Sequence, residues 1–269
     1  MTIQSLTEQI RKKSSFLCVG LDSDKSKLPY SVSQQLEAQF VFNKQIIDAT
    51  HDLAVAYKIN TAFYESDGSE GYQALEKTVH YLNEKYPDHF TIADAKRGDI
   101  GNTSTQYAKA FFEKLSFDSV TVAPYMGQDS IEPFLQFEGK YAILLALTSN
   151  QGAYDFQTLN TVDQSLYETI IATSRTWRGA ERLMYVFGAT KSEYLANVRA
   201  LAPKSFFLIP GVGAQGGDLA SVFHAAANED IGLLVNSSRS IIFASSGDDY
   251  AEAARRAAMD LQQQMKKLL

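Results

Sequence analysis

The residues best suited to chemistry lie in one stretch, Asp94-Ala95-Lys96-Arg97-Gly98-Asp99. An apolar run at residues 90–93 precedes it, so the stretch is expected to be the exit of a strand into a loop. Side chains alternate between the two faces of a strand, so Asp94 and Lys96 point to the same side. The spacing therefore predicts a carboxylate beside an ammonium group at a strand end, with the second carboxylate of Asp99 a short loop away.

Two interpretations of Asp94 and Lys96 are open on spacing alone. An ion pair on the surface is common and contributes little to stability. A strand flanked by helices, however, is buried on both faces, and two charges there need a functional reason. The elements around the stretch decide between these interpretations.

Apolar runs alternate with segments of helical periodicity along the whole chain. The runs are continuous rather than alternating, which is typical of parallel strands covered on both faces. We expect strands at residues 16–21, 54–59, 90–96, 118–123, 141–147, 183–187, 206–210 and 231–235, and helices at 32–50, 72–86, 103–115, 129–137, 162–176, 192–202, 218–227 and 249–268. Eight such units predict an α/β fold, a single (β/α)8 TIM barrel domain over residues 1–269, with an open doubly wound sheet as the alternative.

Composition limits the partners and the compartment. Of the 269 residues, 45% are hydrophobic, and the formal net charge of −6 argues against nucleic acid as the main partner. Neither a signal-peptide core nor an apolar run of membrane-spanning length is present, so we expect a cytoplasmic protein without a membrane partner. Cys18 is the single cysteine and lies in an apolar run, which predicts a buried thiol and no internal disulfide.

Further polar side chains follow the expected strands, where the active site of a barrel lies. They are Asp22, Lys58, Ser149 and Arg239, after the first, second, fifth and eighth strands. Each also has a structural interpretation, since Asp22 and Ser149 can cap turns and Lys58 can extend to solvent from the barrel rim. A barrel would bring them to one face together with Asp94 and Lys96.

A glycine-rich loop, Pro210-Gly211-Val212-Gly213-Ala214-Gln215-Gly216-Gly217, follows the seventh strand. Its Gly-x-Gly-x-x-Gly spacing matches a dinucleotide fingerprint, with Asp230 in range as the ribose acid. Barrels, however, commonly bind phosphate with the loops after strands seven and eight, through backbone N–H groups at a helix start. We therefore favour a phosphate monoester, with Arg239 as a forked cationic donor.

Other chemistries have less support. The histidines do not show metal-ligand spacing, and no Walker lysine motif or nucleophile elbow is present; the histidines are His51, His80, His89 and His224. We therefore expect neither a metal nor an organic cofactor.

Two motifs carry a family resemblance. The stretch from Asp94 to Gly101 and the loop from Pro210 to Gly217 resemble the signature and the phosphate loop of the orotidine 5′-phosphate decarboxylases, in their longer bacterial class. The resemblance covers nearly the whole chain, from Asp22 to Arg239. It implies a TIM barrel that forms a homodimer and converts orotidine 5′-phosphate to UMP and CO2 in pyrimidine biosynthesis without a cofactor.

The resemblance also implies roles for the charged residues. Lys96 would be the general acid that protonates C6 of the pyrimidine after CO2 leaves. Asp94 would lie beside it, near the substrate carboxylate. Lys58 and Asp22 would bind the ribose and order the charges, and Asp99 would reach into the other subunit's site.

The remaining implied contacts are with the partner subunit, the base and the phosphate. Ile100 and Thr103 would accompany Asp99, and Ser149, with Thr148 as the alternative, would contact the pyrimidine. The phosphate would be held by the loop of Pro210 and Gly213, by Gln215 and by Arg239. Before Arg239 stands Ser238, where other members of the family carry glycine.

Two rival functions stay open. A Mg2+-dependent sugar-phosphate decarboxylase of the same superfamily shares an Asp-x-Lys-x-x-Asp pattern, and a catalytically silent nucleotide-binding protein would keep the same loops. The segment from Gln151 to Arg182 has no mechanism that its residues predict.

Overall fold

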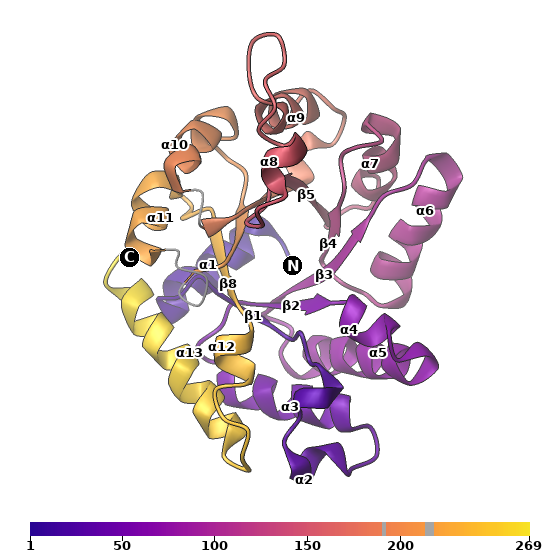
Figure 1. Cartoon of the computed structure of the whole chain (residues 1–269), viewed down its shortest axis with the longest axis vertical. Helices are drawn as coiled ribbons and strands as arrows, with labels where there is room; N and C mark the ends of the chain where they lie inside the picture. Colours follow the sequence, from indigo (N-terminus) through magenta and orange to yellow (C-terminus); the bar gives the residue numbers. More distant parts are fainter. Residues whose placement is uncertain (190–191, 213–217) are drawn as a thin grey trace. The chain divides into compact units, whose positions relative to one another are not determined.

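The computed structural model describes residues 1–189, 192–212 and 218–269. Among these residues, eight parallel strands are hydrogen-bonded in sequence order as a closed barrel, and helices lie between successive strands (Figure 1). The strands are β1 (Leu17–Gly20), β2 (Ala56–Asn60), β3 (Phe90–Arg97), β4 (Ser119–Val122), β5 (Tyr141–Leu147), β6 (Leu183–Phe187), β7 (Phe207–Pro210) and β8 (Leu233–Ser237). The (β/α)8 prediction is confirmed, and the open doubly wound sheet is excluded.

Most helices follow the expected periodicity. Their bounds are α1 (Ile3–Lys13), α2 (Tyr30–Ser33), α3 (Ala38–Thr50), α4 (Ala62–Glu65), α5 (Gly68–Lys85), α6 (Gly101–Lys109), α7 (Gln128–Leu135), α8 (Ala153–Phe156), α9 (Leu166–Ser174), α10 (Ser192–Leu201), α11 (Leu219–Ala226), α12 (Arg239–Ile242) and α13 (Tyr250–Lys266). The helix expected over residues 32–50 is broken, because Glu37 has a left-handed φ of 60° between α2 and α3. The helix expected from residue 162 begins only after a capping box, in which Ser165 and Glu168 each bind the other's backbone.

The described backbone packs as two compact units. The first contains Met1–Ala95, Glu113–Asp118 and Asn236–Leu269, and the second contains Lys96–Phe112 and Ser119–Val235. In the first unit, α3 packs on α5 and α13 (Figure 1), and the Phe42 ring stacks on Phe243 and Tyr250 with centroids 5.6 and 5.1 Å away. A single domain over the whole chain stays a prediction.

A half-buried arginine organises part of the second unit. The Arg199 guanidinium donates to the carbonyl oxygens of Ala226 at 2.7 Å, Ser205 at 2.6 Å and Gly232 at 3.0 Å. It also lies 3.8 Å from the centre of the Phe207 ring. These bonds satisfy carbonyl groups at the end of α11 and just before β7 and β8, so one side chain fixes where both strands begin.

A buried histidine joins three elements of the first unit. Lys13 Nζ donates to the carbonyl oxygens of His51 and Ala54, both at 2.7 Å, and lies 2.8 Å from His89 Nε2. His89 Nδ1 lies 3.1 Å from the Tyr86 carbonyl oxygen, and His89 Nε2 lies 2.7 Å from the His51 carbonyl oxygen. Burial, and then the charge of Lys13, lower the pKa of His89 to about 4.

This lowered pKa predicts a loss of stability in mild acid. The unfolded histidine titrates near its ordinary value, so between pH 6.5 and 4 the unfolded chain holds a proton that the folded chain lacks. Unfolding is then favoured as the pH falls, by about 3 kcal/mol over the whole window.

Urea denaturation of wild type and His89→Gln at pH 7 and pH 4.5 checks this, and the variant should lose clearly less stability on acidification. His80→Gln, at an exposed site on α5, is the control. A His89→Gln profile as steep as that of the wild type would contradict the assignment.

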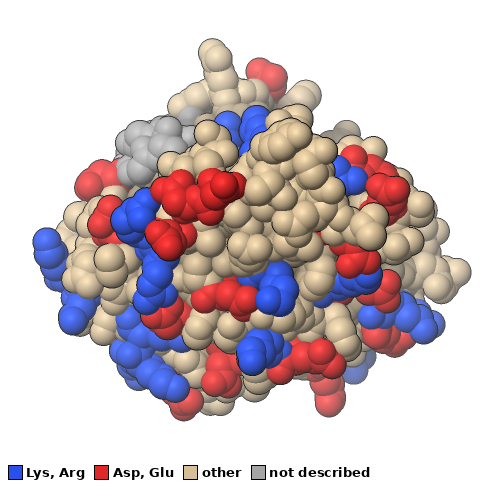
Figure 2. Space-filling view, turned by 90° about the horizontal axis from the view of Figure 1, so that it is seen from below, with Lys and Arg blue, Asp and Glu red and all other residues tan. Residues whose placement is uncertain are grey.

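The surface mixes charges of both signs. Figure 2 shows acidic and basic side chains interspersed over the described part of the face in view. Within residues 1–189, 192–212 and 218–269, no helix combines the length and the apolar character needed to cross a membrane.

Candidate active site

A buried lysine between two carboxylates lies at the ends of the first three strands. Lys58 Nζ is 3.1 Å from Asp22 Oδ1 and 3.1 Å from Asp94 Oδ2. The side chains are 5% exposed for Lys58, 11% for Asp94 and 18% for Asp22. Strand register explains the arrangement, because Gly20 pairs with Lys58 and Asn60 pairs with Asp94. Three of the residues predicted from strand ends are therefore brought together.

The two carboxylates determine the charge of Lys58. Burial disfavours its ammonium form, but the nearby charges of Asp22 and Asp94 outweigh burial and raise the pKa of Lys58. The lysine is consequently a fixed cation at neutral pH. Cys18 is buried as predicted, and burial raises the pKa of its thiol to about 12, so it stays protonated.

Position 238 is a serine where other members of the family carry glycine, and the serine side chain has a specific partner in the first unit. Ser238 Oγ donates to the carbonyl oxygen of Gly20 at 3.0 Å and so ties the exit of β8 to the end of β1. A Cβ atom on Gly20 would lie only 2.7 Å from the Ser238 Cβ, so glycine is required at position 20 beside this serine. Arg239 follows as the first residue of α12, with an exposed side chain.

In the second unit, Lys96 has an unusual backbone. Its φ of 47° lies in the left-handed region, which a residue with a side chain adopts at a cost of about 1–2 kcal/mol. Its amide donates to Thr121 Oγ1 at 2.9 Å, and its side chain is exposed. Strained backbones are concentrated at functional sites, so the strain supports a special role for this lysine.

The loop after Lys96 leads directly into α6. The amide of Ile100 donates to Asp99 Oδ1 at 2.8 Å, and Ile100 is the N-cap residue of the helix. The side chains of Ile100 and Thr103 are exposed. Asp99, Ile100 and Thr103 therefore lie together at the start of α6, and their implied contact with a partner subunit stays a prediction.

The end of β5 distinguishes Ser149 from Thr148. The amide of Thr148 donates to Gln157 Oε1 at 2.7 Å, and its hydroxyl bonds Asn150 Oδ1 at 2.6 Å. Gln157 Nε2 also donates to Thr148 Oγ1 at 3.0 Å. Thr148 is thus engaged by the segment after β5, which favours Ser149 for contact with a ligand. A Cβ on Gly188 would lie 2.6 Å from Ser149 Cα, so glycine at position 188 allows this close approach.

The glycine-rich loop is described only at its two ends. β7 ends at Pro210, and Gly211 has a φ of 96° that favours glycine. Gly213 and Gln215 lie outside the described residues. At the far end, Asp218 caps α11 by accepting from the amide of Ser221 at 2.8 Å. A strand therefore precedes the glycine-rich segment and a helix follows it, as expected.

Sequence reasoning missed the buried polar residues that support the Asp22 loop. Asn43 and Gln39 lie one turn apart on α3, and both are almost completely buried. The available signal was two amides, four residues apart, on the helix face that also carries Phe42, Ile46 and Ile47. Within the described ranges, His, Cys, Asp and Glu side chains form no group of three that could hold a metal ion.

Comparisons with known proteins cover nearly the whole chain. The model of the orotidine 5′-phosphate decarboxylase / HUMPS family matches residues 15–257. An orotidine 5′-phosphate decarboxylase of Flavobacterium johnsoniae is 61% identical over 269 residues, which is 100% of this chain and 98% of the relative. One of Christiangramia forsetii is 60% identical over 265 residues, or 98% of this chain and 97% of the relative.

Solved structures agree with these relatives. Leishmania donovani OMP decarboxylase has a TM-score of 0.84 at 33% identity, covering 100% of this chain and 99% of that chain. Leishmania donovani UMP synthase has a TM-score of 0.86 at 36% identity, covering 98% of this chain and 55% of that chain. The chain therefore belongs to the orotidine 5′-phosphate decarboxylase / HUMPS family.

Proposed function

We propose that this protein is a carboxy-lyase that converts orotidine 5′-phosphate to UMP and CO2 in pyrimidine biosynthesis. The observation that carries the proposal is the buried Lys58 held between Asp22 and Asp94, at strand ends, in a chain of this family. Burying three charges is expensive, and the arrangement is best explained by a reaction that needs fixed charges.

The chemistry matches these residues. Decarboxylation breaks the bond between C6 and its carboxylate, and the electron pair stays on a ring carbon without an adjacent carbonyl to delocalise it. Fixed charges and a ready proton must then lower the barrier. Lys96 gives its proton to C6 as CO2 leaves and recovers one from solvent. Asp94 faces the substrate carboxylate and disfavours it in the ground state.

The other contacts bind parts of the substrate that are distant from the reacting carbon. Lys58 and Asp22 bind the ribose, and Ser149 binds the pyrimidine. Arg239 holds the phosphate together with the loop residues Pro210, Gly213 and Gln215. Binding energy from the phosphate then stabilises the ordered site, which raises turnover and not only affinity. No metal or organic cofactor takes part.

The protein acts as a cytoplasmic homodimer of single-domain subunits, in which Asp99, Ile100 and Thr103 reach the partner's site. Support comes from exposed apolar side chains beside this segment, with exposures of 57% for Ile100, 97% for Tyr125 and 43% for Met126. The amide of Ala123 donates to the Arg97 carbonyl oxygen at 2.8 Å, which places the segment after β4 next to the β3 exit. Clustered exposed apolar groups are typical of an interface.

Mixing two inactive variants tests the shared site. Lys96→Ala and Asp99→Ala should each be inactive, but a mixed dimer contains one site with both residues intact. Random exchange should restore about one quarter of the wild-type activity, as expected for a two-fold dimer. Mixing Lys96→Ala with Asp94→Asn is the matched control. Both residues belong to the site of their own chain, so each site of the mixed dimer lacks one of them and no intact site forms. Failure of the first mixture, with exchange demonstrated by mass spectrometry, would count against donation by Asp99.

The reaction itself is tested by the loss of orotidine 5′-phosphate absorbance with purified protein in EDTA. Rapid loss with formation of UMP supports the proposal. Activity that EDTA removes, together with turnover of a sugar phosphate, would favour the Mg2+-dependent rival. UMP binding by a folded wild-type protein that does not decarboxylate would favour a silent binding protein.

A further inference from the structure

The residues on both sides of Asp22 are held by hydrogen bonds. The Leu21 carbonyl oxygen accepts from Tyr64 Oη at 3.0 Å, and the Leu21 amide donates to the Lys58 carbonyl oxygen at 2.8 Å. On the other side, Ser23 Oγ donates to Asn43 Oδ1, and the Ser23 carbonyl oxygen accepts from Gln39 Nε2 at 2.8 Å. The backbone that carries Asp22 is therefore fixed from α3, α4 and β2.

The side chains that hold this loop form one buried network. Asn43 Nδ2 donates to Tyr64 Oη at 2.8 Å and to Thr78 Oγ1 at 3.0 Å. Thr78 Oγ1 in turn donates to the Ala74 carbonyl oxygen at 2.7 Å. Ser23, Asn43, Tyr64 and Thr78 are completely buried. Every donor of Asn43 is used, so the network fixes a single arrangement of the amide.

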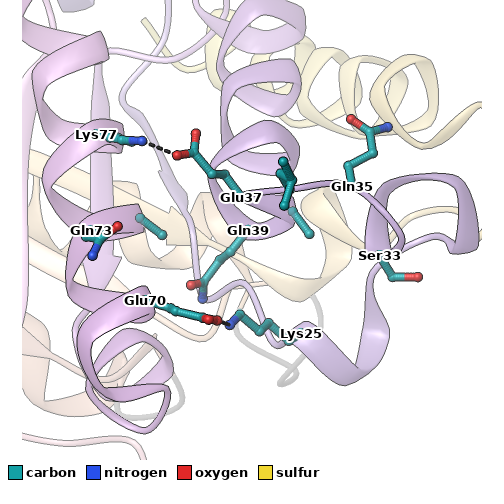
Figure 3. Close-up of a pocket in the computed structure, with 11 residues that line it drawn as sticks. Lys25, Ser33, Gln35, Glu37, Gln39, Glu70, Gln73 and Lys77 are labelled. Carbon is teal, nitrogen blue, oxygen red and sulfur yellow. Dashed lines mark hydrogen bonds and ion pairs between the residues drawn. The ribbon is translucent and has the colours of Figure 1, made fainter.

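Gln39 closes the network on its outer side. Its Nε2 donates to the Phe63 carbonyl oxygen at 3.0 Å as well as to Ser23. Gln39 also lines a surface pocket of about 390 Å3. Figure 3 shows Gln39 in this pocket, with Lys25 and Glu70 beside it. Gln39 therefore both lines this pocket and bonds the loop that carries Asp22.

We infer that Tyr64 and Asn43 are positioning residues that fix the Asp22 carboxylate against Lys58. Asp22 approaches Lys58 to 3.1 Å, and a shift of about 1 Å in a catalytic group is enough to lower a rate by up to about 100-fold. Neither Tyr64 nor Asn43 touches the ion triad, so both act through the backbone at Leu21 and Ser23. The inference rests on the proposed role of Asp22.

The test compares two buried tyrosines. Tyr64→Phe removes the hydroxyl that bonds Leu21 and Asn43 while keeping the ring. Tyr57→Phe is the matched control, because Tyr57 is also completely buried and its hydroxyl bonds Thr50 Oγ1 at 2.8 Å and lies 3.3 Å from the Ile47 carbonyl oxygen, away from Asp22. We expect similar decreases in Tm for both variants. Only Tyr64→Phe should lower kcat/KM, by about 10-fold or more. Equal activity of the two variants would overturn the inference.

A double-mutant cycle separates positioning from general loosening. Asp22→Asn should lower kcat/KM by itself, and adding Tyr64→Phe should then cause little further loss, because the group that it positions is already gone. Losses that multiply in Asp22→Asn/Tyr64→Phe would show that Tyr64 acts independently of Asp22. Wild-type activity of Asp22→Asn would refute the proposed role of Asp22, whereas an impaired Asp22→Asn beside a fully active Tyr64→Phe would refute only the positioning.

Discussion

Lys96→Ala is expected to lower kcat by at least about 100-fold, and by up to about 10,000-fold, since a positioned general acid contributes this much. The variant lacks the ammonium group that is proposed to protonate C6, and it keeps the proposed phosphate and base contacts. UMP should therefore still bind. Alanine keeps the left-handed backbone of position 96, so the fold itself should tolerate the change.

The measurement pairs kcat for orotidine 5′-phosphate with UMP affinity by calorimetry. Lys109→Ala is the control, because Lys109 is an exposed lysine on α6 in the same compact unit. The control also removes a lysine side chain, but it should change kcat by less than about 2-fold, as is usual for surface sites. Normal turnover by Lys96→Ala would refute the proposed proton donor.

Lys58→Met is expected to lower both turnover and stability. The substitution leaves the carboxylates of Asp22 and Asp94 buried without the cation between them. Removing one partner of a buried ion pair typically costs about 3–5 kcal/mol. Because the raised pKa of Lys58 lies above its unfolded value, the wild-type contribution is fully present at neutral pH and is lost only as the pH rises through the folded pKa.

Urea unfolding of Lys58→Met and of the wild type at pH 7 measures this effect as a deficit in unfolding free energy. Lys44→Met is the matched control, since Lys44 Nζ also lies 3.1 Å from a carboxylate, that of Asp48, but at an exposed site. Its loss should stay below about 1 kcal/mol. Equal losses in the two variants would mean that burial of the triad contributes nothing.

The strands of the barrel were predictable because each is a continuous apolar run. β3 was expected at residues 90–96 and spans Phe90–Arg97, and all the expected strands are present among the described residues. The break between α2 and α3 was not predictable, since Glu37 has no composition signal for a left-handed backbone. The five-residue π-helical turn at Ala110–Lys114 was missed for the same reason, because apolar periodicity does not distinguish it from an α-helix.

The candidate site was predictable as far as strand ends determine it. Asp22, Lys58 and Asp94 were named from their positions, and the register of β1, β2 and β3 brings them together. The bonds from Asn43 and Tyr64 to the residues on either side of Asp22 join separate elements, so the amide spacing on α3 could indicate buried polar groups but not their partners. Ser149 was named from the end of the fifth strand with Thr148 as the alternative, and the bond from the Thr148 amide to Gln157 could not be read from either residue alone.

Because the backbone at Lys96 is left-handed, selection for thermal stability and selection for turnover would favour different residues at this position. Glycine at position 96 would avoid the steric penalty that the lysine side chain carries there, which is about 1–2 kcal/mol before the greater chain entropy of glycine is counted. A library screened only for heat resistance should therefore accept glycine at this position, and every such clone would have discarded the proposed proton donor. Lysine at position 96 therefore carries a backbone cost that its proposed role as proton donor would explain.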